Sequence, residues 1–188
     1  MNPASGIGMT FEKPSKKHMP MLRPEDVFKF MQSLYMWNLS VVTRCLIEWQ
    51  LLTLVRPLEA SGTKWDEINF ELSLWEIPVA RRKAKREHLV PLSPQSIETL
   101  RVMEKISRNR EYVFPNRNDP LNPMNSHTAN AAFKRIGYNG KLVAHGLRSI
   151  ASTTINEAEF NSYVIESALA HIDKHEVRRA YNRSIYFD

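Results

Sequence analysis

Two short β-prone runs interrupt a chain that is otherwise patterned for helices. Residues 74–79 and 88–92 are short and apolar, and a strongly basic segment separates them. Such a pair predicts an antiparallel hairpin with a long loop. Apolar residues elsewhere recur at helical spacing, so the sequence predicts an α+β domain that is mainly α-helical and has one small antiparallel sheet.

Helices are expected on both sides of this hairpin. Pro24 suits a first helical position, and a second helix is predicted over about 40–54. Pro57 marks the end of that second helix, so Arg56 and Glu59 are expected in the turn beyond it. The other predicted helices start at Ser93-Pro94 and cover about 127–136, 146–157, 162–170 and 174–182.

The buried faces of two helices follow from the spacing of their apolar residues. The first helix is expected to bury Val27, Phe28, Phe30, Met31 and Leu34. The helix after Ser93 is expected to bury Ile97, Leu100, Val102 or Met103, and Ile106.

The ends and the cysteine content bound the class of protein. Residues 1–20 are rich in proline and glycine and are expected to be a linker remnant, so the folded domain is predicted over 21–188. No apolar run is long enough to span a membrane and no signal peptide is evident, which favours a soluble, cytoplasmic chain. Cys45 is the only cysteine, so an internal disulfide and a cysteine-rich zinc site are excluded.

The charge of the chain indicates a polyanionic partner. Lysine and arginine number 26 against 20 aspartates and glutamates, giving a net charge of +6. The excess is concentrated between the two β-prone runs, and its members are Arg81, Arg82, Lys83, Lys85 and Arg86. A solvated loop is the alternative explanation of such a run.

Six residues at wide spacings together make a metal-free set for cleaving a phosphodiester: Arg56, Lys83, His145, Arg148, His171 and Tyr181. Two guanidiniums can grip a phosphate, a lysine can protonate a leaving oxygen, two imidazoles can move protons and a phenol can attack. Each residue also has a structural alternative. A local ion pair with Glu59 would explain Arg56, an exposed helical stripe would explain His145 and Arg148, and the hydrophobic core would explain His171 and Tyr181.

Several separated blocks together resemble the tyrosine recombinase, or phage integrase, family. The first half of its catalytic domain is matched by Leu51-Leu52-Thr53-Leu54-Val55-Arg56-Pro57-Leu58-Glu59, Trp65-Asp66-Glu67-Ile68, Trp75-Glu76-Ile77-Pro78 and Leu89-Val90-Pro91-Leu92-Ser93. The second half is matched by Tyr112-Val113-Phe114-Pro115, Ala144-His145-Gly146-Leu147-Arg148, Leu169-Ala170-His171 and Arg179-Ala180-Tyr181-Asn182-Arg183. The details are most similar to prophage and genomic-island integrases of the satellite-phage type.

This resemblance implies a site-specific recombinase that cleaves and rejoins double-stranded DNA through a 3′-phosphotyrosine, without a metal or other cofactor. Tyr181 is then the expected nucleophile, Arg56 and Arg148 the phosphate clamp, and Lys83 the acid for the 5′ oxygen. His145 and His171 are expected to bind the phosphate or relay a proton. Arg81, Arg82, Lys85 and Arg86 are expected to hold the DNA backbone, and Glu59 to orient a helix end or a basic neighbour.

The resemblance also implies what a shortened chain lacks. Family members carry DNA-binding domains before the catalytic domain and a helix after the tyrosine, and here only 1–20 precede the domain and seven residues follow Tyr181. The full-length protein is expected to be a tetramer on DNA and this chain a monomer. Leu58 stands where many members have glycine. Two alternatives are a degenerate domain that binds DNA without cutting it and a type IB topoisomerase-like enzyme with the same tyrosine chemistry.

Overall fold

The computed structural model describes residues 19–82, 87–159 and 169. The first elements of the described part are the 3₁₀ turn η2 (Pro24–Asp26) and the helix α1 (Val27–Met36). The longer helices that follow are α2 (Val41–Thr53), α4 (Pro94–Ser107), α5 (Thr128–Arg135) and α6 (Ala144–Glu157). None of the helices in the described ranges is long and apolar enough to cross a membrane.

The sheet is small and antiparallel, as the sequence predicts. Strands β2 (Leu74–Ile77) and β3 (His88–Pro91) pair with Trp75 opposite Val90. A third strand that the sequence did not predict, β1 (Ile68–Asn69), pairs with β2 on its other side. A mainly helical α+β fold is therefore confirmed.

Side-chain caps set two helix starts where the sequence predicts them. The Ser40 hydroxyl accepts a hydrogen bond from the Thr43 backbone N–H at 3.1 Å, and the Ser93 hydroxyl accepts one from Ser96 at 3.2 Å. Each satisfies a backbone donor that the first helical turn leaves open. The predicted helices over 162–170 and 174–182 lie outside the described residues, apart from Leu169.

The turn expected after α2 is in fact a short helix. Leu54 ends α2 in the left-handed conformation with φ of 57°, and α3 (Pro57–Ser61) begins three residues later. Proline both ends a helix and favours the first position of the next one, because its missing N–H is not needed there. Arg56 is therefore the residue that caps α3, and Glu59 lies in its first turn.

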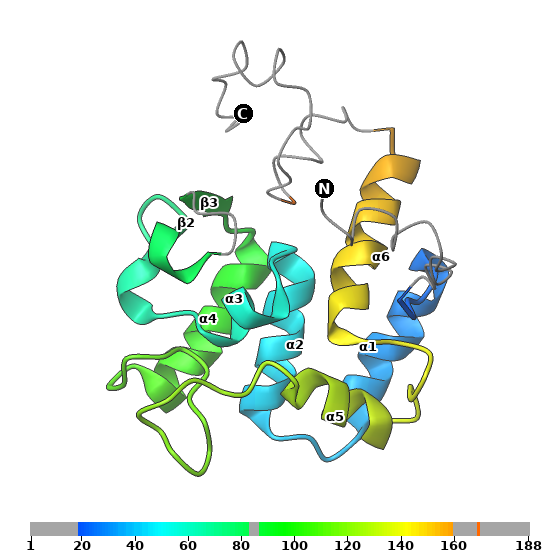
Figure 1. Cartoon of the computed structure of the whole chain (residues 1–188), viewed down its shortest axis with the longest axis horizontal. Helices are drawn as coiled ribbons and strands as arrows, with labels where there is room; N and C mark the ends of the chain where they lie inside the picture. Colours follow the sequence, from blue (N-terminus) through cyan, green and yellow to red (C-terminus); the bar gives the residue numbers. More distant parts are fainter. Residues whose placement is uncertain (1–18, 83–86, 160–168, 170–188) are drawn as a thin grey trace, which may run out of the picture.

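Helix α2 lies at the centre of the molecule and packs on both sides (Figure 1). Trp49 faces the sheet and α4, where its ring lies 5.0 Å from that of Trp75. Ile47 faces α1, α5 and α6, in a second cluster that includes Phe30 and Leu147. The core thus forms around one helix whose C-terminal end leads directly into Arg56.

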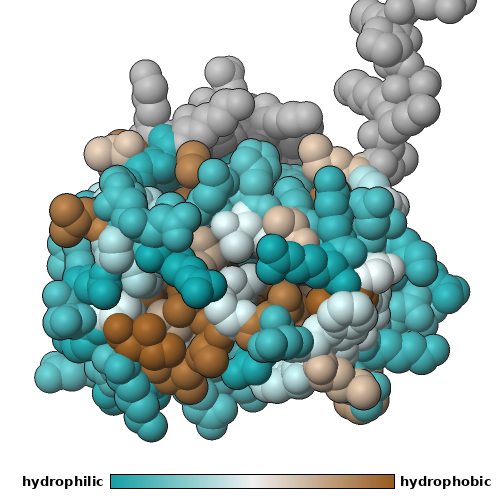
Figure 2. Space-filling view, turned by 90° about the horizontal axis from the view of Figure 1, so that it is seen from below, coloured by the Kyte–Doolittle hydropathy of each residue, from teal (hydrophilic) through white to brown (hydrophobic). Residues whose placement is uncertain are grey.

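The predicted buried faces of two helices are too wide. Phe28 is 71% exposed and Ile106 is 41% exposed, although both were expected in the core, whereas Phe30, Leu34 and Leu100 are fully buried. Figure 2 shows that apolar side chains gather on part of the lower face, within a largely hydrophilic surface. The spacing of apolar residues does not by itself fix the edge of a buried stripe. Single apolar residues on a protein surface are also common.

Candidate active site

Arg56 is held at the start of α3 by Glu59. One carboxylate oxygen of Glu59, Oε2, accepts a hydrogen bond from the Arg56 backbone N–H at 3.1 Å. The other, Oε1, accepts one from Arg56 Nη1 at 3.2 Å. Glu59 is only 4% exposed, whereas the Arg56 side chain is 32% exposed. The guanidinium is therefore anchored at one corner while part of it faces solvent.

Arg148 approaches the same turn from α6. Its Nη1 donates to the backbone carbonyl oxygen of Leu54 at 2.7 Å, and its Nη2 donates to that of Leu169. Burial, together with the nearby charge of Arg56, lowers the pKa of Arg148 to about 10. The structure therefore brings two of the predicted residues together, although they lie far apart in the sequence. Two like charges in one place make a site for an anion.

His145 lies one helical turn before Arg148, in the first turn of α6. Helix α6 starts at Ala144, two residues before its predicted start, because the Asn130 side chain accepts a hydrogen bond from the Ala144 N–H at 2.7 Å. Burial, followed by the charges of Arg148 and Arg56, lowers the pKa of His145. The neutral imidazole is thereby favoured.

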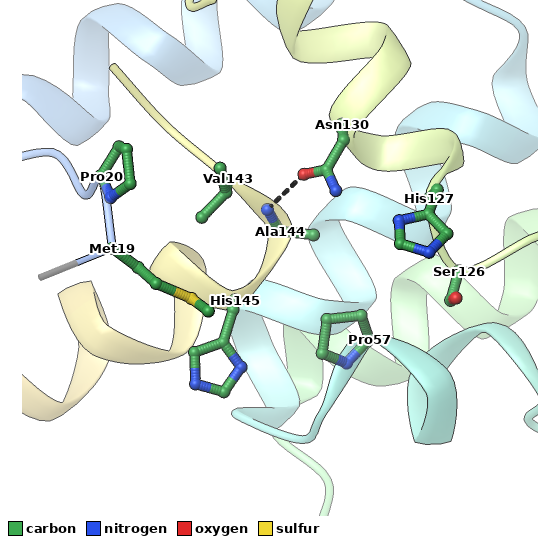
Figure 3. A pocket seen from close by; sticks show the side chains of 9 residues that line it. All are labelled: Met19, Pro20, Pro57, Ser126, His127, Asn130, Val143, Ala144 and His145. Carbon is green, nitrogen blue, oxygen red and sulfur yellow. Dashed lines mark hydrogen bonds between the residues drawn. The ribbon is translucent and has the colours of Figure 1, made fainter. Parts of the chain in front are cut away.

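A pocket of about 330 Å³ lies beside His145. Figure 3 shows His145 and Pro57 at this pocket, with Met19 and Pro20 from the segment before η2 and His127 from the start of α5. The segment before η2 passes so close that a Cβ on Gly146 would lie 2.5 Å from the Pro20 carbonyl oxygen. Glycine at this position of the His-Gly-Leu-Arg run therefore allows the backbone to pass.

Two residues of the basic run point into the protein. Arg81 forms an ion pair with Glu67 and donates from Nη2 to the Glu59 backbone carbonyl at 2.8 Å. The Arg82 side chain is 2% exposed, and its Nε lies 3.4 Å from Glu59 Oε1. A solvated loop therefore does not describe these two residues, because buried carboxylates take them as counter-charges. Their predicted contact with DNA stays a prediction.

His88 lies near enough to the arginines of this site to feel their charge, and it is not among the predicted site residues. It opens β3, is 9% exposed, and its Nε2 has no hydrogen-bond partner among the described residues. Burial lowers its pKa to about 4, and the charges of Arg82, Arg148 and Arg56 act in the same direction while Glu59 opposes them. Alternation with the buried Val90 is the one signal that could have placed it inside.

The other predicted site residues lie outside the described residues. They are Lys83, Lys85, Arg86, His171 and Tyr181. What the described part of the chain brings together is a pair of guanidiniums, Arg56 and Arg148, with His145 beside them and Glu59 behind. In that part, no group of three histidine, cysteine, aspartate or glutamate side chains is placed to hold a metal. This arrangement can bind a phosphate and stabilise added negative charge on it.

Comparison with known proteins identifies relatives over nearly the whole chain. The model of the phage integrase family matches residues 20–186. Prophage integrase IntA of Escherichia coli strain K12 is 54% identical over 186 residues, which cover 99% of this chain and 45% of that protein. The integrase of Enterobacteria phage P4 is 33% identical over 195 residues, covering 96% of this chain and 44% of that protein. The chain thus spans less than half the length of these two relatives.

Solved structures share the fold. A λ integrase dimer bound to a COC′ core site aligns with a TM-score of 0.69 and 19% identity, covering 95% of this chain and 64% of that one. XerH recombinase bound to a palindromic difH substrate aligns with a TM-score of 0.68 and 20% identity, covering 94% of this chain and 53% of that one. At these identities the likeness establishes the fold.

Proposed function

Because the chain belongs to the phage integrase family, we propose that it is the catalytic part of a site-specific recombinase that integrates or excises a prophage or genomic island. The convergence of Arg56 and Arg148 on the turn at Leu54 carries this proposal. Their guanidiniums offer a phosphodiester the two-sided positive environment that its cleavage requires. The enzyme relatives IntA and the P4 integrase support it through their names and their identity to this chain.

The proposed reaction exchanges one phosphoester for another. The Tyr181 oxygen attacks the phosphorus, the bond to the 5′ oxygen breaks, and a 3′-phosphotyrosine forms. Lys83 gives a proton to the departing 5′ oxygen, and His145 and His171 bind the phosphate or take the phenol proton. Religation is the reverse of these steps. Because one ester replaces another, the bond energy is retained and no nucleotide cofactor is needed.

The described residues have a specific task in this reaction. The pentacoordinate transition state carries one more negative charge than the diester, and the proposed task of Arg56 and Arg148 is to stabilise this added charge. The same added charge raises the pKa of neighbouring imidazoles. His145, which is kept neutral before DNA arrives, therefore gains a proton more readily once the phosphate is bound.

Double-stranded DNA containing attachment sites is the proposed partner. The net charge of +6 supports it, as do the DNA-bound structures that share the fold. Assembly of four full-length copies on DNA is part of the proposal, and a λ integrase tetramer bound to a Holliday junction supports it. The proposed location follows from this substrate and is the bacterial nucleoid, in the cytoplasm.

The test is a covalent adduct between the chain and DNA. A nicked half-site, from which the cleaved end diffuses away, should give a protein–DNA adduct that survives SDS and forms equally well in EDTA. Tyr181→Phe should abolish it, while Tyr186→Phe, the neighbouring phenol, should not. An adduct mapped to Tyr186, or one that persists in Tyr181→Phe, would contradict the assignment. Relaxation of supercoils without exchange between two sites would indicate a topoisomerase instead.

A further inference from the structure

The carboxylate of Glu59 is shared between two arginines. Its Oε1 lies 3.2 Å from Arg56 Nη1 and 3.4 Å from Arg82 Nε. Arg82 is fixed from its other end, where Nη1 donates to the Glu87 backbone carbonyl at 3.3 Å. Arg82 is therefore a buried side chain that is held between the Glu59 carboxylate and the Glu87 carbonyl.

Sharing this carboxylate matters because Glu59 could otherwise form a two-pronged ion pair with the Arg56 guanidinium. A buried carboxylate with one arginine partner favours the two-pronged ion pair, which takes up both ends of the guanidinium fork. In the structure Arg56 gives Glu59 one side-chain hydrogen bond, and about one third of its side chain stays exposed. Among the described residues its guanidinium has this one hydrogen bond, so its remaining N–H donors are the ones offered to a phosphate.

We propose that Arg82 is a positioning residue that keeps the Arg56 guanidinium available to phosphate by competing for the carboxylate of Glu59. The inference rests on the proposed function, since it concerns the phosphate clamp of the cleavage site. Arg82 itself touches no substrate in this role. Its effect reaches the reaction only through Glu59 and Arg56.

Arg81 provides a matched control from the adjacent position. It also forms an ion pair with a buried glutamate, but that glutamate is Glu67. Its contact with Glu59 is to the backbone carbonyl oxygen and leaves the carboxylate untouched. Loss of Arg81 therefore removes an anchor of the same segment without removing a partner of the Glu59 carboxylate.

The experiment measures single-turnover cleavage of the nicked half-site by the 188-residue chain, at saturating protein and a temperature at which every variant is folded. Arg82→Met should slow cleavage by roughly 10- to 100-fold, because a misdirected donor loses part of the transition-state contact. Adding Glu59→Gln to Arg82→Met should raise the cleavage rate at least tenfold, on the order of most of the loss. The glutamine amide oxygen still accepts a hydrogen bond from the Arg56 backbone N–H, but the neutral amide no longer attracts the Arg56 guanidinium. Arg82→Lys, which keeps a positive charge beside Glu59, should cleave faster than Arg82→Met.

Arg81→Met should not gain from the same Glu59→Gln substitution. A double variant Glu59→Gln/Arg82→Met that cleaves no faster than Arg82→Met would overturn the proposal, because Arg82 would then be only an anchor. Equal rescue of Arg81→Met by Glu59→Gln would also overturn it. Thermal unfolding of each variant verifies that the protein compared is folded.

A second readout does not depend on cleavage. The Arg56 side-chain N–H signal in ¹⁵N NMR is followed while inorganic phosphate is added. Phosphate should perturb this signal strongly in the wild-type chain and more weakly in Arg82→Met. In the double variant the perturbation should return toward the wild-type size. Equal responses in all three overturn the inference. Absence of any covalent adduct with the wild-type chain counts against the proposed function instead, so the two failures are distinguishable.

Discussion

Arg148 donates a hydrogen bond from Nη1 to the backbone carbonyl oxygen of Leu54 at 2.7 Å, and so connects α6 to the residue that ends α2. Leu54 has a left-handed backbone, and Arg56 follows two residues later. The carbonyl that Arg148 takes up is one of those left open at the end of a helix. One hydrogen bond thus satisfies a helix terminus and sets the second guanidinium beside the first.

This contact predicts how Arg148 responds to substitution. Arg148→Ala should slow formation of the covalent adduct by about 10²- to 10³-fold, the cost of losing a preorganised donor in a transition state. Arg148→Lys should recover little, because a compact ammonium lacks the planar fork with which the guanidinium bonds the Leu54 and Leu169 carbonyls and can also grip a phosphate.

The measurement is the rate of adduct formation on the nicked half-site. Arg101→Lys, at an exposed ion pair with Glu104 on α4, is the matched control and should cleave normally. Near-normal cleavage by Arg148→Lys would mean that Arg148 supplies only diffuse charge.

Gly146→Ala tests the close passage of the N-terminal segment over α6. Helix propensity alone predicts that alanine stabilises the protein by about 1 kcal/mol. The structure predicts the opposite sign, since the new Cβ would lie 2.5 Å from the Pro20 carbonyl oxygen, on backbone that cannot rotate away. We expect a loss of about 1–3 kcal/mol in the free energy of unfolding, measured by urea denaturation. Ser152→Ala, farther along the same helix, is the control, and a stabilised Gly146→Ala protein would show that Pro20 does not pack there.

The hairpin and the starts of two helices could be predicted from sequence, but the contacts of charged residues could not. The positions of β2, β3 and the Ser40 and Ser93 caps follow from local patterns that act over a few residues. The burial of Arg82 depends on Glu59, which lies 23 residues earlier, and no local pattern records that pairing. A run of basic residues therefore looks uniformly exposed in the sequence.

Part of the candidate site could be predicted from the sequence, and part could not. The resemblance to integrases indicated Arg56, His145 and Arg148, and the structure places them together. His88 could not be recognised, because one histidine in an apolar strand is no signal of chemistry. Its importance comes from three arginines that only the folded chain brings near it.

His88 should make the protein sensitive to mild acid. Its pKa is about 4 in the folded state against an ordinary value of 6.5, so the unfolded chain binds the proton more tightly. Stability from this group is therefore complete above pH 6.5 and is lost as the pH falls toward 4, by on the order of 3 kcal/mol. His88→Leu should lose less stability over this interval than the wild-type protein.

The measurement is the free energy of unfolding by urea at pH 7.5 and pH 4.5. The difference between wild type and variant at the two values isolates His88 from the carboxylates that also titrate. His127→Leu, at an exposed histidine, is the control. If the wild-type and His88→Leu proteins lose equal stability between these pH values, then His88 binds a proton as readily in the folded state as in the unfolded state.

Two roles are predicted for the basic segment between β2 and β3: Lys83 as the acid, and its neighbours as contacts to the DNA backbone. If Lys83 protonates the leaving 5′ oxygen, Lys83→Ala should bind DNA normally and cleave it slowly. A sulfur in place of that bridging oxygen is a better leaving group that needs little protonation, so it should restore cleavage to Lys83→Ala. Lys85→Ala should instead weaken binding and lower the slope of log affinity against log salt by about 0.9 per lost phosphate contact. Cleavage rates on the oxygen and sulfur substrates, with dissociation constants at several salt concentrations, distinguish the two. If sulfur rescues Lys85→Ala and not Lys83→Ala, then Lys85 is the acid, and the match to the integrase family is offset by two residues in the segment after Arg82.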